Sequence, residues 1–148
     1  MSTLGLKVFD ETVQLSNAWL NDLMDRMGWD DKQRAYRLLR ASLHALRDRL
    51  SPEEASHLAA QLPMLIRGIY YEGWHPAGKP LKERTRAEFV GHVEEAFKTD
   101  PLSFPDESVS TVIAMLYDKL SDGEMDDVRH AMPRRIRELF PEPAEVED

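Results

Sequence analysis

The sequence contains no cysteine, and this absence excludes disulfide bonds, thiolate catalysis and any zinc site with cysteine ligands. It also has no long apolar run: no segment approaches the roughly 20 apolar residues that a membrane-spanning helix needs. The N-terminus, MSTLGLKVFD, lacks the basic segment followed by an apolar one that marks a secretory signal. We therefore expect a cytoplasmic protein that does not cross a membrane.

Positive charge is scarce relative to negative charge. The 19 Lys and Arg residues are outnumbered by 27 Asp and Glu, which gives a net charge of −8. A general nucleic-acid binder neutralises phosphates and needs the opposite balance, so we expect no nucleic-acid partner. With 42% apolar residues over 148 positions, the chain is long enough to form a core, and we expect one domain over residues 1–148.

Motifs of known catalytic or nucleotide-binding sites are missing as well. The sequence has no G-x-S-x-G nucleophile elbow, no phosphate loop and no G-x-G-x-x-G. The five histidines do not show the H-x-x-x-H spacing of a helical zinc site. We therefore assign no catalytic residue, no cofactor and no metal, and expect a protein that is not an enzyme.

The chain does contain one segment that occurs twice. Residues 50–74 recur without a gap from residue 120 to residue 140, at a constant offset of 70 positions. Such self-similarity predicts a structural unit that is used twice. Identical pairs are Leu50/Leu120, Ser51/Ser121, Glu54/Glu124, Pro63/Pro133, Ile66/Ile136 and Arg67/Arg137, and Asp48/Asp118 extends the match.

Each copy carries the same local signals. Ser51 and Glu54 form a capping box with a proline at the first helical position, and Ser121-Asp122-Gly123-Glu124 repeats the box without the proline. A second proline, Pro63 or Pro133, follows in each copy and cannot continue the helix. Each copy should therefore contain two short helices with a break between them.

Two further helices should precede the first copy, because apolar residues there follow helical spacing. After a leader of little pattern over residues 1–9, a helix should begin at Asp10 and end at Gly28. Asp30 should cap the next helix. The solvent side of that helix would carry Arg34, Arg37, Arg40, Arg47 and Arg49.

Two helices should also precede the second copy. Thr85 with Glu88 forms a capping box for one helix, and Asp106 or Ser103 would cap the next. Residues 72–84 contain two glycines and two prolines and read as a linker. The acidic tail at residues 141–148 should be disordered.

Eight helical segments without strand-like alternation predict an all-α protein. We expect two tandem four-helix repeats, at about residues 10–74 and 85–140, packed into one compact helical domain. A pseudo-two-fold axis should relate them, because one unit alone is too small to bury its apolar faces well.

The runs AAQLP at Ala59–Pro63 and RGIYYEGW at Arg67–Trp74 resemble a bacterial family defined as domain of unknown function 2267. The resemblance extends from about residue 10 to residue 140. The second unit departs from the pattern: Arg134-Arg135 stand in place of Met64-Leu65, and Pro141 in place of Tyr71. The resemblance implies a soluble, all-helical prokaryotic protein and no particular activity.

Two Glu/Asp-x-x-His pairs raise the hypothesis of a metal site. Glu54 with His57 and Asp127 with His130 have the spacing found in di-iron carboxylate bundles. That scaffold also needs further inward glutamates, and Glu54 is already used in the capping box. A structural or solvated role for these residues is the favoured interpretation.

Arg67 and Arg137 are the basic residues that both copies keep. They could bind an anion, or they could form salt bridges to acids that both copies also keep. Those acids are Glu54/Glu124 and Asp48/Asp118. We favour the structural salt bridge.

The aromatic segment Tyr70–His75 raises two alternatives. Its side chains could fill the seam between the two units, which we favour, or they could form a surface for a partner or ligand. The residues of that candidate binding surface are Arg67, Tyr71, Trp74 and His75.

A basic cluster in the second copy could contact phosphate or an acidic partner, although a solvated face is the favoured interpretation. Its members are Arg129, His130, Arg134, Arg135 and Arg137. Together these observations favour a protein-interaction or regulatory module with an unknown protein partner or self-association. The alternative is a small-molecule or metal-binding protein, with possible enzymatic activity, that uses the cleft between the repeats.

Overall fold

The computed structural model describes residues 5–142, and within that range the chain forms eight helices and no strand, as expected for an all-α protein. None of the described helices combines the length and the apolar character needed to cross a bilayer. The tail expected to be disordered lies, from residue 143 on, outside the described residues. The helices are α1 (Lys7–Met27), α2 (Lys32–Asp48), α3 (Pro52–Ala60), α4 (Met64–Tyr71), α5 (Arg86–Glu95), α6 (Pro105–Lys119), α7 (Asp122–Ala131) and α8 (Arg134–Arg137).

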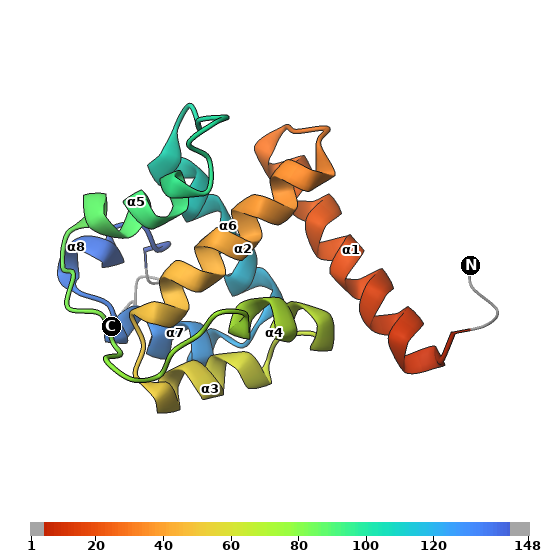
Figure 1. Cartoon of the computed structure of the whole chain (residues 1–148), viewed down its shortest axis with the longest axis horizontal. Helices are drawn as coiled ribbons and strands as arrows, with labels where there is room; N and C mark the ends of the chain where they lie inside the picture. Colours follow the sequence, from red (N-terminus) through yellow and green to blue (C-terminus); the bar gives the residue numbers. More distant parts are fainter. Residues whose placement is uncertain (1–4, 143–148) are drawn as a thin grey trace, which may run out of the picture.

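The core is arranged around α2, which crosses the middle of the molecule (Figure 1) and packs against α1, α4, α5 and α6. Its apolar residues recur every three or four positions, and burial of each leucine contributes about 1.5–3 kcal/mol. The other helices close around this row. Fully buried side chains include Leu38, Leu43 and Leu46 of α2 together with Leu23, Leu58, Ile66, Tyr70, Phe89 and Ile113.

The helix pairings follow the pattern that two related units would produce. The first helix, α1, packs against α2 and α6, and α5 in turn packs against α6 and α2. The pairs α1–α4 and α5–α8 correspond in the same way, while α3 lies against α7. This pattern is consistent with two tandem four-helix repeats, which remain a prediction.

Most of the local signals act as predicted. Ser51 and Thr85 both form complete capping boxes, and Gly28 ends α1 in the left-handed conformation with φ of 68°. The prolines interrupt the helix in both copies: α3 ends at Ala60 before α4 begins, and α7 ends at Ala131 before α8 begins.

Three predicted helix starts are wrong. The first helix begins at Lys7 rather than Asp10, and the aspartate lies in its first turn, where it complements the helix dipole. Asp31, not Asp30, caps α2, because only its carboxylate lies three positions before the Arg34 N–H that it accepts, at 3.2 Å.

The third helix start that was predicted wrongly is that of α6. Neither Asp106 nor Ser103 caps it: the N-cap is Phe104, without a side-chain hydrogen bond, and Pro105 stands at the first helical position. A proline there lacks the N–H group that a cap would otherwise have to satisfy, so the capping side chain is less needed.

Candidate functional site

Arg67 and Arg137 both bind the end of the helix that precedes them. Arg67 donates from Nε to the carbonyl of Ala59 at 2.8 Å and from Nη2 to that of Leu62 at 2.9 Å. Arg137 donates to the carbonyls of Met132, at 2.9 Å, and His130, at 3.2 Å. The predicted salt bridges to acidic residues are therefore wrong, because the last carbonyls of a short helix lack backbone donors and carry partial negative charge.

The other residues of the predicted surface do not converge on one point. The rings of Tyr71 and Trp74 lie 5.3 Å apart, and Tyr71 also meets Tyr70 edge to face at 5.2 Å. Tyr71 and Trp74 are partly buried and pack against the core, whereas His75 is exposed. The structure thus brings two of the four predicted residues together, with Arg67 turned toward α3.

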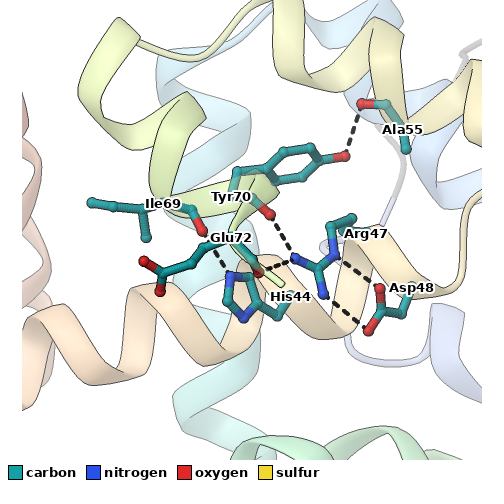
Figure 2. Close-up of polar contacts among 7 residues, drawn as sticks. All are labelled: His44, Arg47, Asp48, Ala55, Ile69, Tyr70 and Glu72. Carbon is teal, nitrogen blue, oxygen red and sulfur yellow. Dashed lines mark hydrogen bonds and ion pairs between the residues drawn. The ribbon is translucent and has the colours of Figure 1, made fainter. Parts of the chain in front are cut away.

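The aromatic segment is held in place by a buried arginine that we expected to face solvent (Figure 2). Arg47 is 4% exposed and donates from Nη1 to the carbonyls of Tyr70 and Glu72, at 2.8 and 2.9 Å. Its Nε donates to Asp48 Oδ1 at 2.8 Å. The prediction for Arg47 is wrong because α4 ends against this face of α2, and its last carbonyls need donors.

Two titratable side chains complete this network. The Tyr70 hydroxyl donates to the carbonyl of Ala55 at 2.9 Å, and burial raises the pKa of that hydroxyl. His44 donates from Nε2 to the carbonyl of Ile69 at 2.7 Å. Burial lowers the pKa of His44, against the smaller opposing effect of this hydrogen bond. These contacts join α2, α3 and α4 and assign the cluster a structural role.

A cleft of about 320 Å³ lies between α3 and α7. All four residues of the metal hypothesis line it, which are Glu54, His57, Asp127 and His130, together with Glu124. Glu54 and Glu124, like His57 and Asp127, are equivalent positions at the offset of 70. The described residues nevertheless contain no group of three acidic or histidine side chains placed to hold a metal ion.

Of the two equivalent glutamates in this cleft, Glu124 is the one that has no capping role. In α3, Glu54 accepts the N–H of Ser51 at 2.9 Å, but the N–H of Ser121 goes to Gln61 Oε1 at 3.0 Å. Burial raises the pKa of Glu124, and the negative charges of Asp127 and Glu54 raise it further. The cleft is therefore acidic, and it disfavours the charged form of Glu124.

An exposed apolar surface lies at the start of α1, where the sequence indicated only a leader. The N-terminal end of this helix extends away from the rest of the molecule (Figure 1). Phe9 is 56% exposed and Val13, which helical spacing groups with the buried Trp19, is 45% exposed. The surface continues onto α4, where the Leu65 N–H donates to Thr12 Oγ1 at 3.0 Å. We call this set the α1 apolar face: Leu6, Val8, Phe9, Val13, Leu15, Met64 and Leu65.

Comparison with curated proteins found no match. The model of the family described as "Uncharacterized conserved protein (DUF2267)" matches residues 16–139. This span begins at Ser16, the first buried residue of α1, and includes α2 to α8. Because the match covers most of the sequence, the chain belongs to the DUF2267 family.

Proposed function

We propose that this protein is a protein-interaction module that binds a second copy of itself through the α1 apolar face. The observation that carries the proposal is the exposure of seven large apolar side chains at the start of α1, including its N-cap Leu6, and at the start of α4. Single exposed apolar residues are normal on protein surfaces, but a contiguous patch marks an interaction site.

The second half of the chain offers a comparison for this surface. At the offset of 70, α5 begins at Arg86, the equivalent of Ser16, so the first nine residues of α1 have no helical counterpart. The positions equivalent to the exposed Met64 and Leu65 are Arg134 and Arg135. Charged residues suit solvent, so the apolar residues on the first unit favour a covered surface there.

The area of the face is sufficient for a dimer interface. Seven half-exposed apolar side chains amount to on the order of 400 Å², near the size of the largest patch on a typical monomer. Two copies would cover about 800 Å² of apolar surface, and with a polar rim the total passes the roughly 1,000 Å² of a specific interface. Area alone does not set the affinity, because association also costs translational and rotational freedom, side-chain ordering and polar desolvation.

A second copy suits the face because a two-fold axis places one patch against itself. Two α1 helices that cross antiparallel near Phe9 would bring the apolar residues of both together.

The test is the mass in solution, measured by sedimentation velocity and native mass spectrometry across a concentration series. We expect the wild-type protein to be a dimer with a mass of twice 17.1 kDa. Val13→Glu should give the monomer, because it places a charge inside the apolar interface. Gln14→Glu is the matched control, since it adds the same charge at an exposed polar position of α1 and should leave the dimer intact. A wild-type monomer at 0.5 mM, or a dimer that survives Val13→Glu, would contradict the proposal.

A second function is favoured by the uncapped Glu124: we also propose that the α3–α7 cleft binds a small cationic amine. The pKa of Glu124 is raised above 4.5, so its favourable contribution to folding is complete below pH 4.5 and is lost as the pH rises through its folded pKa. Glu124→Gln should therefore raise the free energy of unfolding at pH 7 and not below pH 4.5, as measured by urea denaturation.

The same variant tests the ligand. Calorimetric titration with 1,4-diaminobutane should detect binding to the wild type and a loss of at least tenfold in Glu124→Gln. Glu53→Gln is the control, because Glu53 is exposed in the first turn of α3. An equal loss in both variants would show that net charge alone attracts the amine.

A further inference from the structure

Four arginines line a pocket of about 490 Å³ at the end of the molecule formed by α5, α7 and α8. Arg86 opens α5, Arg129 lies in the last turn of α7, and Arg134 and Arg137 belong to α8. Glu138 and Glu142 also line the pocket. A surplus of positive charge in one hollow is unusual in a chain whose net charge is −8.

Two of these arginines have structural partners. Arg137 donates to carbonyls at the end of α7, and Arg86 forms an ion pair with Asp106, with Nε 3.1 Å from Oδ2. The exposed carboxylate of Glu138 is shared between Arg86, at 3.9 Å, and Arg135, at 3.7 Å. Of the two acidic residues that line the pocket, Glu138 is therefore already paired.

The other two arginines are not neutralised. Among residues 5–142, no carboxylate lies within 4.0 Å of Arg129 or Arg134. The Nε of Arg129 is buried and has no hydrogen-bond partner in the described structure. A buried charged donor without an acceptor is destabilising, so its retention needs an explanation.

The helix dipole explains only part of this arrangement. A cation in the last turn of α7 is stabilised by the negative end of that helix, which accounts for the charge of Arg129. It does not account for the orientation that buries Nε away from both water and carbonyl groups. An acceptor supplied from outside the chain would satisfy that donor if the guanidinium turns its Nε toward the pocket.

We propose that this pocket binds a phosphate group carried by a small molecule. Arginine presents planar pairs of N–H donors that match the oxygens of phosphate two at a time. Arg129 and Arg134 would supply such pairs, and Arg137 would fix the position of the end of α7 beside the pocket. A phosphate dianion uses two positive charges and several donors, whereas a carboxylate would leave donors unmatched.

The experiment is a titration of the ¹⁵N-labelled chain with inorganic phosphate at constant ionic strength, observed on the arginine Nε–H resonances. We expect saturable shifts at Arg129 and Arg134, with a dissociation constant of about 1 mM or lower. Phosphate should also raise the melting temperature relative to chloride at the same ionic strength. Malonate should bind at least tenfold more weakly, and equal binding of malonate would overturn the assignment to phosphate.

Matched arginine variants test the site itself. Arg134→Gln and Arg129→Gln should each weaken phosphate binding about tenfold, the effect of one lost charge-assisted contact. Arg135→Gln removes the same charge from the same short helix outside the pocket lining and should change binding less than threefold. Arg134 is exposed, so its variant tests the proposal even if Arg129→Gln impairs folding. Shifts that do not saturate, or an equal loss in all three variants, would overturn it.

Discussion

Replacement of Arg47 with alanine should destabilise the fold far more than loss of the partly exposed arginines on the same helix. Arg47 is the donor for two carbonyls at the end of α4 and the partner of Asp48. Alanine would leave these acceptors in place without a donor and with little access to water. The guanidinium stem would also leave a void beside Leu43 and Leu46 in the core around α2.

The magnitude follows from the lost contacts. Each buried acceptor without a donor costs about 1–3 kcal/mol, and removal of one member of a buried ion pair costs about 3–5 kcal/mol. These contributions do not add, because one side chain makes all the contacts, and Asp48 keeps some contact with water, so we expect a total loss of about 3–5 kcal/mol. A typical domain has only about 5–15 kcal/mol of stability, so the variant would be close to unfolding.

Urea denaturation followed by tryptophan fluorescence measures this loss. Arg47→Lys should lie between alanine and wild type, because an ammonium keeps the charge beside Asp48 but cannot serve both carbonyls as a planar fork does. Arg40→Ala is the control: its guanidinium also binds residue 72, but through the exposed Glu72 carboxylate at 2.5 Å. A loss below about 1 kcal/mol for Arg47→Ala, or an equal loss for Arg40→Ala, would refute the reasoning.

Two further predictions concern the same region. Burial lowers the pKa of His44 below 6.5, so the contribution of His44 to stability is complete above pH 6.5 and declines as the pH falls through its folded pKa. Urea midpoints measured from pH 8 to pH 5 should show this decline in the wild type and less of it in His44→Gln. Trp74→Ala should lower the free energy of unfolding by about 3 kcal/mol in the same assay. Trp74→Phe should cost much less, because phenylalanine keeps an aromatic ring and removes a buried indole N–H that has no acceptor. Equal losses in the two variants would argue against packing as the role of Trp74.

Signals that act within a few residues could be predicted from the sequence. Ser51, Thr85, Gly28 and the two interrupting prolines act as expected, because a cap or a break depends on atoms only a few positions away. The eight helices followed from these signals and from apolar spacing. The cap of α2 was predicted one position too early, at Asp30 instead of Asp31, because the two aspartates are equally suitable caps.

Contacts made across the fold could not be predicted in the same way. Arg47 follows Leu46 in the sequence and is close to the apolar row of α2, but only the end of α4 shows why a charge belongs there. The exposure of Phe9 and Val13 likewise depends on where the other helices stop. For the candidate sites, the sequence identified Glu54, His57, Asp127 and His130, and it missed Glu124, whose release from the capping box depends on Gln61.

The hydrogen bonds between Gln61 and Ser121 couple the two halves of the chain. Gln61 donates from Nε2 to Ser121 Oγ at 3.1 Å and accepts the Ser121 N–H at 3.0 Å, so the end of α3 completes the start of α7. The start of α7 is therefore fully hydrogen-bonded only when the end of α3, in the first half of the chain, is in place. Arg26 and Lys119 add ion pairs between α1 and α6, to Asp118 and Asp22. The consequence is cooperativity: both halves should unfold in a single transition, with no half-folded species at equilibrium.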